Sequence, residues 1–283
     1  MDKTLLKGLA VLEAVTNEPD GVQTIDDLAA LVGLTRSNAH RTVQTLIHAG
    51  YVEREPGSGC YRGTTKLFEL GARSVRKLDV RKVAPPVMQR LSATTHETVH
   101  LSVLDGIEVV YIEKIDSALP IRAYTSLGGR APAYAVATGK ALLAVQPDDY
   151  LDAYGAQLHR HTPSTIIDLT ALRKELARAR TLGYAINRGE WREGVGGVAA
   201  PVFDGSECAV AALGISGPLD RLNMARMREF GPLVVRLAFQ LSRAMGYTRE
   251  YVPSFDGLVR KAVPSRRARA EAAAPASSTT KGE

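Results

Sequence analysis

The sequence predicts an α+β protein of two domains, in which a small helical domain with a hairpin precedes a larger domain of strands and helices. Apolar residues recur at three- and four-residue steps over residues 2–49, the period of amphipathic helices. Two short β-type runs around a Gly/Ser-rich turn follow at 51–66. Beyond residue 81, strand-like and helical runs alternate, which predicts a mixed sheet covered by helices. A chain of 283 residues is long enough for about two such domains.

The first two predicted helices have clear ends. The first covers about residues 2–16, and a turn follows it. Thr24 is expected to cap the second helix, because Asp27 lies three residues later in the position of a capping box. Gly33 is expected to end this helix.

The third predicted helix begins after its cap, Thr35, and runs to Ala49, where Gly50 stops it. Its apolar residues share one face and its polar residues the other. Two helices, a tight turn and a capped third helix form a helix-turn-helix. The runs "YVERE" and "CYRGTTK" on either side of "PGSG" add a hairpin, so residues 1–65 are predicted to be a winged helix.

The polar face of the third helix has the residue types that read base edges in a DNA major groove, with Arg suited to guanine and Asn or Gln to adenine. Basic residues on the wing suit phosphates. The charge also changes sign here: residues 1–34 hold two basic and six acidic side chains, and residues 35–82 hold ten basic and four acidic. A solvated surface helix is the alternative. The predicted DNA-binding residues are Thr35, Arg36, Ser37, Asn38, His40, Arg41 and Gln44 on the helix, and Arg54 and Arg62 on the wing.

Residues 66–80 have an amphipathic pattern with a basic outer face, and we interpret them as a linker helix. The stretch "APPVM" then opens the second domain, expected to cover residues 81–250. Residues 251–283 are rich in Ala, Ser and Arg, which predicts a disordered, solvated tail. Nonspecific attraction of its "RRAR" run to phosphates is the alternative.

In the second domain the period of the apolar pattern separates strands from helices. A helix is expected to start at "ATGKALLAV", another is capped by Thr170 and closed by Gly183, and a last one covers 223–246. The predicted strands are "ETVHLSVLD", "EVVYIEKI", "IRAYTS", "YAIN", "VGGVAAPVF" and "CAVAALGIS". Such a sheet covered by helices fits a sensor domain with a ligand cleft.

Composition excludes several classes of protein. No run of about 18 apolar residues exists, so no membrane span is expected. The first residues lack the apolar core and cleavage site of a signal peptide, which predicts a cytoplasmic protein. The net charge of +6 favours an acidic partner. Cys60 and Cys208 have no metal-binding spacing and are expected to be reduced thiols, so no metal and no cofactor is predicted.

No motif in the chain predicts catalysis. His96 and His100 occur in "THETVH", but this segment alternates like a strand and lacks the residue order of a zinc motif. Glu190 and Glu193 are interpreted as solvated carboxylates, and Cys208 has no histidine close in sequence. We therefore expect that the protein is not an enzyme. The alternative is a small-molecule sensor, or an enzyme assembled in space, without sequence-specific DNA binding.

The segment "ATGKA" places Gly139, Lys140 and Ala141 at the start of a helix, where backbone N–H groups favour an anion such as a carboxylate. A phosphate-binding P-loop is rejected, because Tyr134 occupies the place of its first glycine and Ala141 that of its Ser or Thr. The alternative for Lys140 is a surface lysine at a helix end.

Eight stretches spread over both domains have the order and spacing of one known family. They are "LKGLAVLEAV", "SNAHRTVQTLIHAGYVE", "LFELG", "ETVHLSVLDG", "YAVATGKALLA", "LARARTLGYA", "EGVGGVAAPVFD" and "AALGISGP". On these stretches the chain, up to about residue 246, resembles a transcriptional regulator of the IclR type. The resemblance implies a winged-helix DNA-binding domain joined to a GAF-like effector domain. It also implies dimers or pairs of dimers that respond to small metabolites.

In relatives that bind small acids, the pocket combines backbone amides at this helix start with an acid, a cysteine and two serines. The matching positions here are Asn187, Gly197, Gly214 and Ser216, in that order. Three of the four depart from the family pattern, which implies a roomier and less acidic pocket. The implied ligand is larger than a two- or three-carbon acid, such as an aromatic or other bulky carboxylate. The aromatic residues that are candidates to line the pocket, with ordinary core packing as the alternative for each, are Tyr124, Tyr134 and Trp191.

A dimer of this kind places two third helices in successive major grooves about 34 Å apart, on a pseudo-palindromic operator. Effector binding is expected to bias the placement of the two winged helices through residues 66–80, which requires different affinities for two states. Repression of a metabolic or catabolic operon is the commoner outcome in the family, and activation is the alternative.

Overall fold

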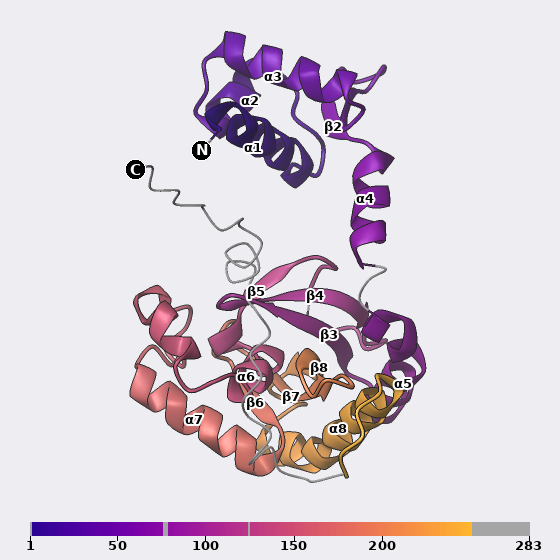
Figure 1. The fold of residues 1–283 in the computed structure, drawn as a ribbon, viewed down its shortest axis with the longest axis vertical. Helices are drawn as coiled ribbons and strands as arrows, with labels where there is room; N and C mark the ends of the chain where they lie inside the picture. The colour runs from indigo at the N-terminus through magenta and orange to yellow at the C-terminus, as the bar shows by residue number, and fades with distance from the viewer. Residues whose placement is uncertain (1, 76–78, 124, 251–283) are drawn as a thin grey trace, which may run out of the picture. The chain divides into compact units, whose positions relative to one another are not determined.

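The computed structural model describes residues 2–75, 79–123 and 125–250. The chain divides into two compact units, one up to residue 78 and one from residue 79 onward (Figure 1). The predicted tail at 251–283, part of the predicted linker, and Tyr124 lie outside the described residues.

The first unit begins with the helices α1 (Lys3–Asn17), α2 (Ile25–Val32) and α3 (Arg36–His48). The predicted cap at Thr24 is confirmed: its hydroxyl accepts the Asp27 N–H at 3.1 Å and donates to the Asp27 carboxylate at 2.6 Å. Gly33 ends α2 at a φ of 64°, a left-handed conformation that favours glycine.

The helix α3 buries its apolar face and exposes its polar face, as predicted. Thr35 caps it by accepting the Asn38 N–H at 3.4 Å. Ala39 and Val43 are fully buried. A 13-residue helix is marginal on its own in water, so burial of this face holds α3 in place. The buried core of the unit consists of Val11, Val15, Val22, Leu28, Val43, Val52 and Tyr61.

The predicted hairpin is confirmed as β1 (Val52–Arg54) paired antiparallel with β2 (Tyr61–Gly63). A further bridge ties it to the α1–α2 connection. The Val22 N–H donates to the Tyr61 carbonyl at 3.0 Å, and the Tyr61 N–H donates to the Val22 carbonyl at 2.8 Å. The sequence did not predict this contact, because it joins segments far apart in the chain.

Two helices follow the wing, α4 (Thr65–Val75) and α5 (Asp79–Thr95). The stretch "APPVM" lies inside α5, the first helix of the second unit. Pro85 and Pro86 lack the N–H that would bond carbonyls one turn earlier. Both prolines lie on the exposed side of α5.

The second unit contains one six-stranded sheet in the order β5-β4-β3-β8-β7-β6. Every described pair in it is antiparallel, so the predicted mixed sheet is wrong. The predicted strand "IRAYTS" is also wrong, and the edge strand β5 lies a few residues later. The strands are β3 (Thr98–Asp105), β4 (Glu108–Ile115), β5 (Arg130–Pro132), β6 (Ala185–Arg188), β7 (Val195–Phe203) and β8 (Ala209–Pro218).

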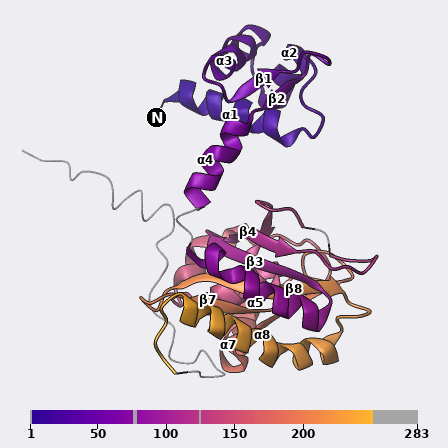
Figure 2. The same ribbon diagram turned by 90° about the vertical axis from the view of Figure 1, so that its right-hand side faces the viewer.

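Helices cover both faces of this sheet. A Cβ at Gly196 would meet Met227 of α8, whereas a Cβ at its neighbour Gly197 would meet Ala137 of α6, so α6 and α8 pack on opposite faces. The helix α5 lies beside α8 in both views (Figures 1 and 2). The remaining elements are η1 (Ala133–Ala135), α6 (Ala137–Ala144), η2 (Tyr150–Gln157), α7 (Leu169–Leu182) and α8 (Met224–Ala244).

The predicted N-terminal cap of the helix α7 is wrong. Asp168, and not Thr170, caps α7 by accepting the Ala171 N–H at 2.7 Å. Gly183 ends the helix in the left-handed conformation, as predicted. Within the described part of the chain, none of the helices combines the length and the apolar character needed to cross a membrane.

Candidate functional site

The structure offers two candidate sites, one in each unit. The first is the outer face of α3. Six of the seven polar residues predicted around this helix are exposed, and Asn38 is half-buried. The side chains are therefore presented to solvent on one face, as a DNA-reading helix requires.

Two of these side chains are held by exposed polar contacts. The Arg36 guanidinium pairs with the Asp26 carboxylate at 2.7 Å, and both side chains are more than half exposed. The Arg41 guanidinium donates to the Asn38 side-chain oxygen at 2.9 Å. Exposed pairs of this kind contribute about 0–1 kcal/mol, so both arginines remain free to exchange these partners for phosphates or bases.

The two wing arginines, by contrast, hold the hairpin together. The Arg62 guanidinium donates to the Glu55 carboxylate at 2.9 Å and to the Asp20 carbonyl at 3.3 Å. The Arg54 Nε donates to the Gly59 carbonyl at 3.0 Å. Arg54 is exposed and Arg62 is only half-exposed. The structure therefore shows Arg62 bracing the wing, a role that the sequence did not reveal.

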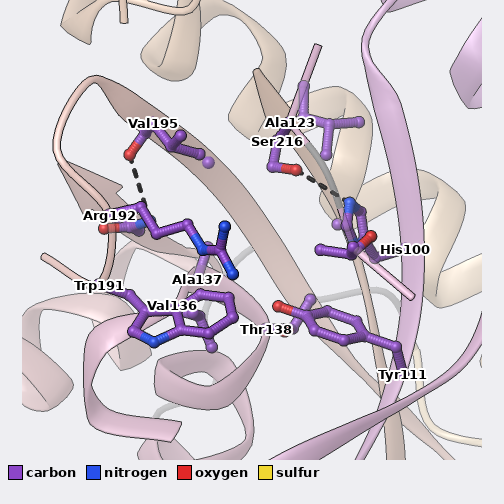
Figure 3. A pocket seen from close by; sticks show the side chains of 15 residues that line it. His100, Tyr111, Ala123, Val136, Ala137, Thr138, Trp191, Arg192, Val195 and Ser216 are labelled. Atoms are coloured by element: carbon purple, nitrogen blue, oxygen red, sulfur yellow. Dashed lines mark hydrogen bonds between the residues drawn. The ribbon is translucent and has the colours of Figure 1, made fainter. Parts of the chain in front are cut away.

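The second candidate site is a cavity of about 50 Å³ in the second unit. It lies against the N-terminal end of α6, among residues of β3, β4, β6, β7 and β8, of the β4–β5 connection and of the loop between β6 and β7. Figure 3 shows Trp191 and Arg192 on one side and His100, Ser216 and Tyr111 across from them. The cavity is lined by His100, Tyr111, Ala123, Thr125, Val136, Ala137, Thr138, Asn187, Trp191, Arg192, Val195, Gly197, Gly214, Ile215 and Ser216.

His100 forms the polar base of the cavity. Its Nε2 lies 2.9 Å from the Ser216 hydroxyl, and its ring packs edge-on against Tyr111 with centroids 4.9 Å apart. Burial lowers the pKa of His100 from 6.5 to about 4, and the charge of Lys114 adds to this effect while Asp116 opposes it. The imidazole is therefore neutral near pH 7 and has one donor and one acceptor nitrogen.

Tyr111 is a neutral lining residue of the cavity, and Arg192 is a charged one. Burial raises the pKa of Tyr111 to about 12, although the positive charge of Arg192 acts in the opposite direction, so the phenol is a neutral donor. Arg192 is exposed, and its guanidinium lies 4.6 Å from the Trp191 ring. Among the described lining residues it is the one charged side chain. The cavity therefore favours an anionic ligand.

The N-terminal end of α6 adds to this preference. Val136 precedes the helix without a side-chain cap, and Val136, Ala137 and Thr138 all line the cavity. The first N–H groups of a helix lack intrahelical acceptors and carry partial positive charge. The predicted anion-favouring helix start is thus beside the cavity, about one turn earlier than the predicted residues.

Five residues predicted from the resemblance line this cavity. Asn187, Gly197 and Ser216 form one row across neighbouring strands, since Asn187 pairs with Gly197 and Gly197 with Ser216. Gly214 lies directly opposite His100. Trp191 lines the cavity from the β6–β7 loop.

Of the other predicted effector residues, those in the described part of the chain do not line this cavity. Gly139, Lys140 and Ala141 are buried in α6, and Lys140 is fully buried, so its reading as a surface lysine is wrong. A side chain at Gly139 would collide with the backbone of η1. Tyr134 lines a different hollow, where its hydroxyl bonds the His159 carbonyl at 3.0 Å.

The resemblance implied that Gly197 and Gly214 make the pocket roomier. The structure shows that they do not. A Cβ at Gly197 would lie 2.9 Å from the Ile215 carbonyl oxygen. A Cβ at Gly214 would lie 2.6 Å from the Ala199 Cβ. Neighbouring atoms therefore fill the space that the missing side chains leave, and the cavity of about 50 Å³ is only large enough for a few water molecules.

Sequence reasoning missed His100, Tyr111, Thr138 and Arg192 as lining residues. His100 fits the alternating pattern of the strand β3. That pattern does not distinguish a residue that lines a cavity from one that lies in the core. Arg192 lies on a loop in a segment rich in charged residues, where solvent exposure is the ordinary expectation.

A helix-turn-helix unit with an exposed polar helix, followed in one chain by a sheet unit with an anion-favouring cavity, defines a transcriptional regulator that binds DNA and responds to a small molecule. The IclR helix-turn-helix domain model matches residues 4–56, and the model of the C-terminal domain of bacterial transcriptional regulator IclR matches residues 72–243. The chain belongs to the IclR family of bacterial transcriptional regulators. It is accordingly a regulator and not an enzyme.

Individual relatives agree with this assignment. The HTH-type transcriptional regulator XynR of Escherichia coli is 37% identical over 243 residues, which is 85% of this chain and 96% of XynR. The HTH-type transcriptional repressor AllR of Escherichia coli is 32% identical over 246 residues, or 86% and 90% of the two chains. An IclR homolog of Microbacterium hydrocarbonoxydans, solved in complex with 4-hydroxybenzoate, has a TM-score of 0.74 at 29% identity and covers 86% of this chain and 100% of its own.

Proposed function

We propose that this regulator is a repressor of a metabolic or catabolic operon, and that it releases a pseudo-palindromic operator when a small organic acid enters the cavity beside α6. The single observation that carries the ligand class is the cavity itself. Arg192 is its one charged side chain among the described lining residues, and the adjacent end of α6 has no side-chain cap. Repression is supported by AllR, a relative that is named a repressor.

The effector is a compact acid with one carboxylate and a hydroxyl or other polar group. Arg192 and the end of α6 bind the carboxylate. The neutral pair of His100 and Ser216 bonds the polar group, since imidazole and hydroxyl each donate and accept. A relative that binds 4-hydroxybenzoate supports an aromatic acid of this kind. The exposed Arg192 lies where such a ligand enters, so its guanidinium can pair with the carboxylate.

DNA is bound by the exposed face of α3. Arg36, Asn38, Arg41 and Gln44 read bases or contact phosphates in the major groove, and Arg54 of the wing contacts a phosphate. A dimer is needed to bind a pseudo-palindrome. Support for a second copy comes from the exposed leucines of α1, Leu5, Leu6 and Leu9, which form an apolar stripe that a monomer leaves in water.

The test is a fluorescence-anisotropy titration of the full chain with the DNA upstream of its own gene and of the neighbouring genes, at two salt concentrations. The titration is repeated with benzoate, 4-hydroxybenzoate, pyruvate and glyoxylate. Sequence-dependent binding that an aromatic acid weakens supports the proposal. Release by pyruvate or glyoxylate alone would refute the ligand class, and tighter binding with the acid would refute repression by release.

A further inference from the structure

Lys140 is a buried cation whose partners lie on other elements. Its side chain is 0% exposed, and its ammonium lies 2.8 and 2.9 Å from the two oxygens of Glu190, which is 2% exposed. Glu175 of α7 approaches the same ammonium at 3.4 Å. A buried charge is stable only when it is paired and hydrogen-bonded, so this geometry is strongly determined.

Glu190 belongs to the loop between β6 and β7, which carries Trp191 and Arg192. This loop has no strand pairing of its own over residues 189–194. Polar contacts hold Glu190 from several sides. Its N–H donates to the Asn187 side chain at 2.9 Å, and its carbonyl accepts the Thr165 hydroxyl at 2.6 Å.

The ion pair therefore joins two walls of the cavity. Ala137 and Thr138 line it from the first turn of α6, and Lys140 follows on the same helix. Trp191 and Arg192 line it from the loop, directly after Glu190. Neither Lys140 nor Glu190 lines the cavity itself.

We propose that the Lys140–Glu190 ion pair is a positioning element that holds the loop of Trp191 and Arg192 against α6 and so presents the Arg192 guanidinium to the ligand. Lys140 thus acts on the effector site through Glu190, without touching the effector. This inference rests on the proposed function insofar as the cavity is the effector site, but the position of the loop is measurable without any ligand.

An ion pair that served only stability would be replaceable. Apolar side chains of similar size often substitute for a buried pair at little or no loss of stability, whereas removal of one partner leaves a buried charge. Apolar contacts lack the direction of two short hydrogen bonds to one carboxylate. The double variant Lys140→Met/Glu190→Leu therefore separates positioning from stability.

The chain contains a single tryptophan, so its fluorescence reports on this loop alone. The experiment is acrylamide quenching of Trp191 emission in the full chain, for the wild type and for Lys140→Met/Glu190→Leu. The control is Arg81→Met/Glu113→Leu, which removes a 2.9 Å ion pair between α5 and β4 whose two residues do not line the cavity. Thermal melting followed by circular dichroism shows which variants are folded.

The expected result is a severalfold higher quenching constant for the double variant and an unchanged constant for the control. An unchanged constant in a folded double variant would overturn the proposal. If the double variant does not fold, the variant Glu190→Gln is used to test the proposal. It keeps the size of the side chain and one hydrogen-bond acceptor for Lys140. Its quenching constant is expected to lie above that of the wild type, and equality with the wild type overturns the proposal.

A second readout keeps this proposal apart from the effector assignment. Each folded variant is titrated with 4-hydroxybenzoate, using the Trp191 emission as the signal. Weaker binding by the double variant than by the control supports positioning of the site. If the wild type binds no carboxylate, the assignment of the cavity fails, while the quenching result still decides the role of the ion pair.

Discussion

The imidazole of His100 and the hydroxyl of Ser216 meet at 2.9 Å at the base of the cavity, although the two residues are 116 positions apart in the chain. Adjacent antiparallel strands bring them together, since His100 pairs with Gly214, two residues before Ser216. The glycine leaves no side chain opposite the imidazole. This pair places a neutral donor and acceptor where an effector would meet the sheet.

The buried His100 is expected to make stability depend on pH. Its pKa in the folded protein is about 4, against 6.5 for the ordinary value, with Lys114 lowering it and Asp116 raising it. Between these values the unfolded chain binds more protons, so stability is present above pH 6.5 and falls as pH is lowered toward 4. The contribution of His100 to this loss is up to about 3 kcal/mol.

Urea unfolding of the wild type and of His100→Gln at pH 7 and pH 4.5 measures this contribution. The variant is expected to lose less stability than the wild type between the two pH values. His40→Gln, on the exposed face of α3, is the control and should follow the wild type. Parallel losses in all three proteins would contradict a lowered pKa at His100.

Arg192→Gln is expected to weaken binding of 4-hydroxybenzoate by about ten- to a hundredfold, because a charge-assisted hydrogen bond contributes about 1.5–3 kcal/mol. Isothermal titration calorimetry gives the affinity, and the melting temperature should change little since Arg192 is exposed. Arg188→Gln changes an exposed arginine outside the cavity and should bind as the wild type does. Equal affinities in the two variants would exclude Arg192 as the carboxylate-binding group.

Arg41→Ala is expected to weaken operator binding by about 1–3 kcal/mol and to relax specificity at one base position, if its guanidinium contacts a base. Anisotropy titrations against single-base operator variants measure both effects. An equal loss on every sequence would instead identify a phosphate contact. Arg236→Ala, at an exposed position of α8, serves as the control and should leave DNA binding unchanged.

Arg62→Ala is expected to lower the stability of the first unit by about 1 kcal/mol, because it removes the bond to Glu55 and the bond to the Asp20 carbonyl. A double-mutant cycle with Glu55→Gln, followed by thermal melting, gives the coupling between the two side chains. Arg54→Ala is the comparison, since Arg54 bonds only its own hairpin. Loss of DNA binding without loss of stability in Arg62→Ala would show that Arg62 acts as a phosphate contact.

Leu5→Ser/Leu9→Ser is expected to weaken self-association by about tenfold or more, because a second copy would bury both leucines and each buried leucine contributes about 1.5–3 kcal/mol. Sedimentation velocity over a range of protein concentrations measures the dissociation constant. Leu31→Ser changes an exposed leucine of α2 and is the control. An unchanged constant would place the dimer contact elsewhere.

The first unit could be predicted almost completely from local sequence. The cap at Thr24, the left-handed Gly33 and the cap at Thr35 are signals that lie within about one turn of the helix they delimit. They therefore need no tertiary information. Where two local signals competed, the prediction failed, as when Asp168 rather than Thr170 capped α7.

The second unit depended on contacts between distant segments. Strand periodicity predicted most strands but not their partners. The antiparallel order of the sheet and the position of β5 could therefore not be predicted from the sequence. The cavity, for the same reason, collects residues from β3, β4, β6, β7, β8, the start of α6 and two loops. Its glycine positions were predicted by resemblance, but the neighbouring atoms that fill the space beside them were not.

Lys140 shows most clearly the difference between what local sequence predicts and what tertiary contacts decide. From the residues around it, a lysine at a helix start is a surface group or an anion ligand. Folding instead brings Glu190, 50 positions later, onto its ammonium, and this pairing, together with Glu175, offsets the cost of burying the charge. Most helix ends and the exposed polar face of α3 follow from neighbouring residues, because capping and periodicity act over a few positions. The pairing of buried charges and the shape of the cavity follow from packing, because they depend on which distant segments become neighbours.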